Sequence, residues 1–241
     1  MKLTDRQGKI LNWIVRDYID TAQPIGSEHL DKKHKTGLSP ATLRNEMQKL
    51  TDKGFLSQPH TSAGRIPTDK GYRFFVNNLI NQKEKENVNI EDGFDKLTTS
   101  WFEKEIGDTF KFVQSITKHI AQSSGALTLN YLEKENVFWK EGWEEVLEEP
   151  EFEERDCLLN FTDFLRRFEE NIDEIKNGED INVYIGKENL LPKSKDFSVI
   201  SSHYHLPSGE QGIISLLGPK RMEYDRNINL INSLIKLLEE F

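Results

Sequence analysis

Residues 41–49 carry side chains of the types that read DNA bases. If this segment is a helix, its apolar residues share one face, and the opposite face presents Ala41, Arg44, Asn45, Gln48 and Lys49. Arginine can make a bidentate contact to guanine, and asparagine or glutamine can make one to adenine. Thr42, near the start of the segment, can reach a phosphate or a thymine methyl group. The same residue types are common on a solvated helix face, and composition alone does not separate the two interpretations.

The turn at residues 60–65 is small and polar and ends in a cation. Its small residues would let the backbone approach phosphates, and Arg65 could enter a narrow minor groove. Ser27 begins a predicted helix, where free backbone N–H groups favour a phosphate. An ordinary tight turn is the alternative interpretation. The candidate DNA-contacting residues are Ser27, Ser39, Thr42, Arg44, Asn45, Gln48, Lys49, His60, Thr61, Ser62, Gly64 and Arg65.

Four predicted helices and one short hairpin would position these side chains. Helical spacing of apolar residues and N-cap residues predict helices over 3–22, 27–34, 39–54 and 68–81, capped by Thr4, Ser27, Ser39 and Thr68. Short strands are expected on either side of the turn at 59–65. Three helices, a hairpin and a further helix predict a winged helix-turn-helix domain over residues 1–81.

A second domain is predicted over residues 107–241, after a polar linker over 82–106. Helices are expected at 107–122, with Phe110 in its buried stripe, at 158–176, with Ile175 facing inward, and at 222–240. Strands are expected at 126–132, 181–185, 197–203 and 212–217. The acidic segment 133–156 is expected to be a surface loop or a short helix. The predicted fold class is therefore α+β, with the sheet strands late in the chain.

Charge is distributed unevenly along the chain. Residues 1–83 contain 14 Lys and Arg against 8 Asp and Glu, a net charge of +6, whereas residues 84–241 carry −15. A basic module joined to an acidic body favours one domain that meets phosphates, although uneven charge is weak support by itself. With no secretory signal, no apolar stretch of about 20 residues and a lone Cys157, we expect a cytoplasmic protein without membrane contact.

Four motifs resemble those of the HrcA repressor family. They are LSPATLRNEM (38–47), QPHTSAGRIPTDKGYR (58–73), VYIGKEN (183–189) and GPKRMEY (218–224). Their separation and their order make the resemblance specific. It implies a winged-helix domain followed by a GAF-like domain, and binding as a homodimer to the inverted-repeat CIRCE operator upstream of heat-shock chaperone genes. It also implies dependence on the GroE chaperonin, whose titration by heat-damaged proteins releases repression.

The chain departs from the family pattern between Leu132 and Val137. Family members carry an inserted dimerisation domain there, and in this sequence the two residues are separated by four positions. The loss puts the family's dimer contacts in doubt and predicts a reduced GAF-like domain, whose sheet could be incomplete. The terminal helix at 222–240 becomes a candidate dimer surface.

Two further functions stay open. The GAF-like domain could sense a small molecule, or the protein could act structurally or as a chaperone client through its acidic body, with DNA binding vestigial. His203 and His205 could hold a metal together with Cys157 or a carboxylate, but exposed strand histidines and an idle thiol fit the spacing better. The segment 218–221 could bind an anion or simply form a strand-to-helix turn. No sequence motif of a phosphate-binding loop, a zinc protease or a serine hydrolase occurs, so neither an enzyme nor a cofactor is expected.

Overall fold

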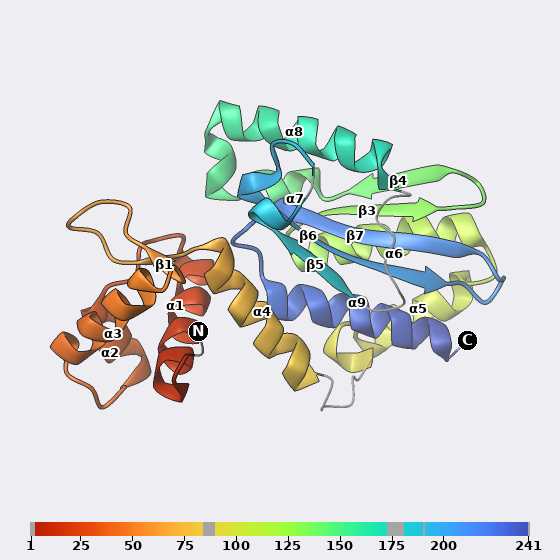
Figure 1. The fold of residues 1–241 in the computed structure, drawn as a ribbon. Helices are drawn as coiled ribbons and strands as arrows, with labels where there is room; N and C mark the ends of the chain where they lie inside the picture. Colours follow the sequence, from red (N-terminus) through yellow and green to blue (C-terminus); the bar gives the residue numbers. More distant parts are fainter. Residues whose placement is uncertain (1–2, 84–89, 173–180, 190, 241) are drawn as a thin grey trace. The chain divides into compact units, whose positions relative to one another are not determined.

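A computed structural model describes residues 3–83, 90–172, 181–189 and 191–240 (Figure 1). The chain forms two compact units, Met1–Gln82 and Lys83–Phe241. Helices and antiparallel strands occur together, so the fold belongs to the α+β class, as the sequence predicted. Each unit has a core of its own and is described by itself.

The first unit consists of three helices, a short hairpin and a fourth helix. Its elements are α1 (Asp5–Thr21), α2 (Ser27–His34), α3 (Pro40–Asp52), β1 (Leu56–Ser57), β2 (Ile66–Pro67) and α4 (Asp69–Lys83). α1 begins where its sequence provides a capping box: Thr4 accepts from the backbone of Gln7, and the Gln7 side chain accepts from the backbone of Thr4. The apolar stripes of α1, α3 and α4 meet in the core, with Ile14, Leu43 and Val76 fully buried.

Three of the four predicted helix caps are present. In addition to the cap at Thr4, Ser39 accepts from the backbone of Thr42, and Thr68 accepts from the backbone of Gly71. The prediction for Ser27 was wrong: Gly26 is the N-cap of α2, and Ser27 is the first residue of the helix and is buried. Gly26 already has the extended backbone that an N-cap requires, so the helix starts one residue earlier than a serine cap would place it.

The second unit is a five-stranded sheet with helices on both faces (Figure 1). Its helices are α5 (Lys96–Glu105), α6 (Thr109–Ser124), α7 (Trp143–Leu147), α8 (Arg155–Glu170) and α9 (Tyr224–Glu239). Its strands are β3 (Leu127–Leu132), β4 (Val137–Glu141), β5 (Asn182–Ile185), β6 (Phe197–His205) and β7 (Gln211–Pro219). Short 3-10 turns lie at Ile90–Asp92, Pro150–Glu153, Gly186–Glu188 and Ser194–Asp196. The strand order is β4-β3-β7-β6-β5, and every neighbouring pair is antiparallel.

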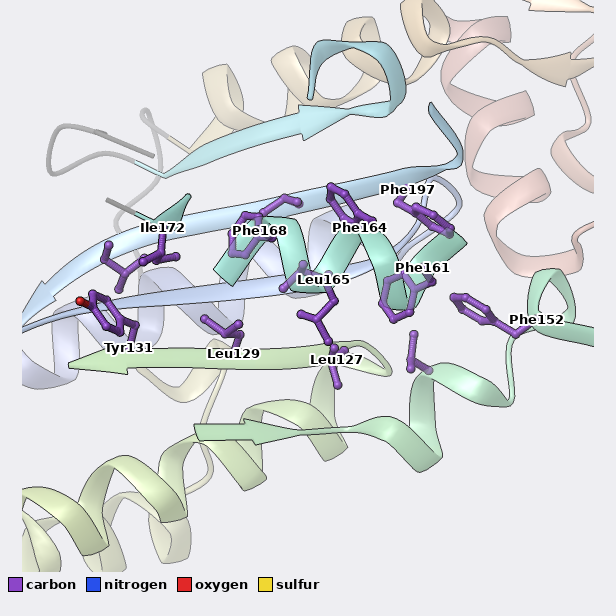
Figure 2. Packing of buried hydrophobic residues seen from close by; sticks show 14 residues of the cluster. Leu127, Leu129, Tyr131, Phe152, Phe161, Phe164, Leu165, Phe168, Ile172 and Phe197 are labelled. Atoms are coloured by element: carbon purple, nitrogen blue, oxygen red, sulfur yellow. The ribbon is translucent and has the colours of Figure 1, made fainter. Parts of the chain in front are cut away.

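One face of this sheet packs against α8 through aromatic rings. Figure 2 shows Phe161, Phe164 and Phe168 of α8 beside Phe197 of β6, with Leu129 of β3 in the same cluster. The ring centroids of Phe161 and Phe197 are 5.0 Å apart, and those of Phe164 and Phe197 are 5.6 Å apart. Burial of each large apolar side chain contributes about 1.5–3 kcal/mol. α8 is therefore held to the sheet chiefly by its phenylalanines.

The opposite face packs against α6 and α9 and contains several buried polar groups. The Tyr204 hydroxyl donates to the amide oxygen of Asn130 at 2.6 Å, and the hydroxyls of Ser198 and Tyr224 are 2.8 Å apart. Thr128, two residues before Asn130 on β3, is fully buried, and its hydroxyl has no hydrogen-bond partner among the described residues. This layer is more polar than the apolar periodicity of its helices suggests.

The segment predicted as a linker contains ordered structure over its described part. Ile90–Asp92 forms a 3-10 turn and Lys96–Glu105 forms α5, while residues 84–89 lie outside the described residues. Phe94 and Phe102 are buried, and their ring centroids are 5.7 Å apart. The prediction failed here because these two rings are separated by polar residues and leave no periodic stripe.

Three other details of the second unit differ from the prediction. Phe110 is 51% exposed: it lies in the first turn of α6, and its ring contacts Trp139 of β4, with centroids 5.7 Å apart. The acidic segment contains a strand, β4, as well as the short helix α7. α9 packs most of its apolar residues within its own unit, so it offers no broad apolar face to a second copy. Ile175 lies outside the described residues.

Candidate nucleic-acid interface

A groove of about 690 Å³ in the first unit joins the three regions that the sequence singled out. It lies between the start of α2, the exposed face of α3 and the loop at residues 58–65. Its walls are formed by Gly26, Ser27, Glu28, Arg44, Asn45, Met47, Gln48, Gln58, Thr61, Ser62, Ala63, Gly64 and Arg65. Residues nearly forty positions apart in the sequence therefore face one concave surface.

The α3 wall presents two polar side chains without internal partners. Leu43, Met47 and Leu50 are buried, which turns Arg44 and Asn45 toward the groove. Within the part of the chain that the structure describes, no hydrogen bond or ion pair engages Arg44 or Asn45. Both are therefore available to an external ligand, and together they offer a cation, amide donors and an amide acceptor.

The other polar residues of α3 are already engaged. The Gln48 amide nitrogen donates to Asp52 at 2.8 Å, and the Lys49 ammonium lies 3.0 Å from a Glu46 carboxylate oxygen. Both side chains are solvent-exposed, so an external ligand could still reach them. Gln48 lines the groove, whereas Lys49 does not.

The loop at residues 58–65 is shaped by its own hydrogen bonds. The Gln58 side chain donates to the carbonyl oxygens of Thr61 and Ala63 at 2.9 and 3.0 Å. At the end of the loop, the backbone of Arg65 exchanges two hydrogen bonds with Ile25, of 2.9 and 2.8 Å. A Cβ at Gly64 would lie 2.4 Å from the carbonyl carbon of Ile25, so only glycine fits this approach.

Two buried carboxylates hold the helices that frame the groove. Glu46 of α3 is 3% exposed and accepts from Gln7 at 3.0 Å and from Arg6 at 2.9 Å, both on α1. The hydrogen bond from Gln7 holds the pKa of Glu46 below its ordinary value, against the opposing effect of burial. Glu46 therefore anchors α3 to α1 in its ionised form.

The second buried carboxylate, Asp17, links α1 to α2. It is 1% exposed and lies 2.7 Å from the Lys33 ammonium and 2.9 Å from the His34 imidazole. Burial pushes the pKa of Asp17 upward, but the hydrogen bonds from Lys33 and His34 outweigh it, so the pKa lies below its ordinary value. The His34 ring also stacks on Trp13, with centroids 5.0 Å apart.

Eight of the twelve candidate residues line the groove. They are Ser27, Arg44, Asn45, Gln48, Thr61, Ser62, Gly64 and Arg65. Ser39, Thr42, Lys49 and His60 lie outside its lining, although the hydroxyls of Ser39 and Thr42 are 2.9 Å apart at the exposed start of α3. Sequence reasoning missed Gln58 and Glu28, and the only available signal was their position next to the turn and next to Ser27.

In the second unit, the metal site, the Cys157 thiol and the anion-binding segment considered from the sequence find little support. Among the described residues, no group of three or more His, Cys, Asp or Glu side chains could hold a metal ion. Burial raises the pKa of the Cys157 thiol to about 11, with Asp196 adding to the shift. Arg221, in the segment considered for anion binding, pairs with Glu149 and Glu151 of the acidic segment. Its charge is therefore used inside the unit.

No helix in the described part of the chain is long and apolar enough to cross a lipid bilayer.

A cavity of about 330 Å³ lies at the end of β6, where His203, Tyr204 and His205 meet Ile235 and Leu238 of α9.

Comparisons with known proteins point to one family. Residues 74–228 match the family model described as the HrcA protein C terminal domain. The heat-inducible transcription repressor HrcA of Thermoanaerobacter sp. (strain X514) is 30% identical, over 99% of this chain and 96% of that protein. The repressor of the same name from Brevibacillus brevis is 28% identical, over 96% of each chain. The alignment with the Thermoanaerobacter protein spans 333 positions, more than the 241 residues of this chain, so that repressor carries segments that are missing here.

A solved structure supports the fold. The chain resembles a crystal structure of a hypothetical protein at 2.2 Å resolution, with a TM-score of 0.79 and 21% identity, covering 99% of this chain and 98% of the other.

Proposed function

The chain belongs to the HrcA family of heat-inducible transcription repressors, and from this premise we propose that it represses chaperone genes by binding an inverted-repeat CIRCE operator. Proteins of this family are transcription repressors, so the chain is not an enzyme. The observation that carries the proposal is the groove in which the unpartnered Arg44 and Asn45 of α3 face the loop at residues 58–65.

The first unit would act as a winged helix-turn-helix. In that arrangement the second helix of the pair enters the major groove and the first braces it. α3 takes the recognition role, with Arg44 bidentate to a guanine, and with Asn45 and Gln48 directed at adenines. The contacting surface that we propose also includes Ser27, Ser39, Thr42, Lys49, His60, Thr61, Ser62 and Gly64, and Arg65 lies in the lining of the same groove.

Backbone phosphates would be met on both sides of α3. Thr61 and Ser62 offer hydroxyls from the loop, while Ser39 and Thr42 offer theirs from the start of the helix. The net charge of +6 over residues 1–83 supplies the sequence-independent attraction to DNA. Glu28 is the one acid among the described residues that line the groove. Its negative charge repels phosphates, which disfavours a site that binds DNA by charge alone and favours one that accepts the duplex in a single register.

We assign pairing of two copies to the second unit, which we propose to be a GAF-like domain. An inverted repeat has two-fold symmetry, and a homodimer matches it with one α3 in each half-site. By the same family resemblance, folding of the repressor would depend on the GroE chaperonin, and heat would release it from DNA. Measuring operator affinity after a heat pulse, with and without chaperonin, tests this part: full affinity under both conditions contradicts it.

The decisive experiment compares two duplexes of equal length by fluorescence anisotropy at fixed salt. One carries the CIRCE sequence and the other a scrambled sequence. A preference of about a thousandfold or more is in the range of specific regulators and would support the proposal. Equal, salt-dominated binding to both duplexes would contradict it, because the first unit would then hold DNA without reading it.

A second candidate function rests on the cavity of about 330 Å³ beside β6 and α9. Its volume is at the lower end for small-molecule sites, and its lining combines apolar residues with His203 and His205. The second unit could therefore sense a small molecule that alters DNA binding. A thermal-shift screen of metabolites tests this, and the absence of any ligand that raises the unfolding temperature counts against it.

A further inference from the structure

The guanidinium of Arg65 points onto α3 and makes two hydrogen bonds there. Its Nε donates to the Thr51 hydroxyl at 3.0 Å, and its Nη2 donates to the Gln48 amide oxygen at 2.9 Å. The backbone of the same residue is paired on both sides with Ile25. Arg65 therefore connects the loop at residues 58–65 to the segment before α2 through its backbone, and to α3 through its side chain.

We propose that Arg65 is a positioning residue, which fixes the loop at residues 58–65 relative to the recognition helix and makes no contact of its own with a DNA phosphate. The proposal rests on the proposed DNA-binding function and refines the role of one residue in that surface. Of the two arginines that line the groove, Arg65 is hydrogen-bonded internally, and Arg44 makes no hydrogen bond or ion pair within the described residues.

The partners of Arg65 are themselves fixed. The Thr51 hydroxyl donates to the Met47 carbonyl at 2.9 Å, so its lone pairs face the guanidinium. The Gln48 amide accepts from Arg65 and donates to Asp52, so each end makes one internal hydrogen bond and keeps one lone pair or one hydrogen for a base. This network settles which way the amide is turned and places a cation at the C-terminal end of α3, where the helix dipole favours one.

The chemistry of arginine suits this role. A planar guanidinium presents several donors in a rigid fork and can hold two acceptors at a fixed angle, whereas a lysine ammonium is a single point charge on a flexible stem. A phosphate contact would be largely kept by lysine because it requires only the charge. The lysine substitution therefore separates the two roles.

The first test uses the full chain without DNA. Arg65→Ala and Thr51→Val are made singly and together, and the denaturant midpoint of the first unit is followed by hydrogen exchange of the backbone amides of α1 and α3, because three of the four tryptophans lie in the second unit. If the two residues act through one contact, the double variant unfolds at about the midpoint of the less stable single variant. Additive shifts in the midpoint would overturn the proposal. This result does not depend on whether the protein recognises CIRCE.

The second test measures binding of Arg65→Ala and Arg65→Lys to CIRCE and scrambled duplexes over a range of salt. We expect the preference for CIRCE to fall about fivefold or more in both variants, because α3 and the loop lose their fixed geometry. We also expect the slope of log K against log salt to stay that of the parent protein. A slope that falls by about one in Arg65→Ala and returns in Arg65→Lys would identify a phosphate contact and overturn the proposal.

A control distinguishes failure of this inference from failure of the proposed function. If the parent protein shows no preference for CIRCE, the proposed function is wrong, and the unfolding cycle alone then decides on the role of Arg65. If the parent is specific and Arg65→Lys keeps the full preference, the repressor function stands and the positioning role is wrong. Lys9→Ala serves as a matched loss of charge outside the groove, on the exposed face of α1.

Discussion

Replacing Arg44 by alanine should separate base reading from general attraction to DNA. Arg44 is exposed on α3 and has no partner within the described residues, so its loss breaks no internal contact. We therefore expect the free energy of unfolding to change by less than about 0.5 kcal/mol. A bidentate arginine–guanine pair contributes about 1–3 kcal/mol of discrimination, which corresponds to a loss of about 5- to 140-fold in operator affinity for each half-site.

The assay is a set of anisotropy titrations on CIRCE duplexes in which each base pair is replaced in turn. In the parent protein, replacement of the guanine pair that Arg44 contacts weakens binding. In Arg44→Ala the same replacement should have no further effect, while the other positions keep theirs. Lys9→Ala removes an equal charge away from the groove and should weaken CIRCE and scrambled DNA alike and only slightly.

Two results would refute the reasoning about Arg44. If Arg44→Ala lost the same factor on CIRCE and on scrambled DNA, the residue would supply charge and would not read a base. If the variant unfolded at a clearly lower denaturant concentration, the side chain would have an internal role that its lack of partners does not predict.

Three further outcomes follow from the buried groups and the loop. Glu46→Gln should destabilise the first unit at pH 7. The hydrogen bond from Gln7 lowers the pKa of Glu46 in the folded protein, so the ionised carboxylate stabilises the unit fully above the ordinary pKa of 4.5, and this stabilisation is lost as the pH falls below that value. Identical acid unfolding curves for the parent and the variant would contradict this. Gly64→Ala should cost about 1–3 kcal/mol of stability and weaken operator binding, because its Cβ would lie 2.4 Å from Ile25, and an unchanged urea midpoint would show that the loop can move aside. Thr128→Val should leave the melting temperature unchanged or raise it, since it removes a buried hydroxyl without a partner, and a clear drop would reveal one.

The elements around the groove could be predicted because their signals are local. Ser39 and Pro40 mark the start of α3, and the spacing of Leu43, Met47 and Leu50 gives its buried face within one short segment. Once that face is fixed, the opposite face with Arg44 follows from helical geometry alone. The small residues of the loop at 58–65 likewise indicate a turn without any knowledge of the rest of the chain.

The features that escaped prediction depend on partners distant in sequence. A glutamate on a helix reads as exposed, and only the packing of α1 against α3 brings Gln7 to Glu46, 39 positions away. The direction of the Arg65 side chain is of the same kind, since a turn arginine can face solvent or a neighbouring helix. Phe94 and Phe102 lie in a polar segment, where two isolated rings form no period that could indicate a core.

The strand order of the second unit determines how late in translation its core can close. β3 is an interior strand of the sheet and pairs with the central strand β7, so that Leu127 lies opposite Leu217. The first unit closes within its first 82 residues, whereas the second core stays open until β7 has been translated. Synthesis of the stretch between Leu132 and Gln211 takes roughly 4–16 seconds at about 5–20 residues per second. During that interval the apolar strand β3 has no β7 to cover its edge, and contacts of such long range form slowly. Completion of the second unit therefore sets both the delay before a whole repressor exists and the period in which the nascent chain is open to aggregation.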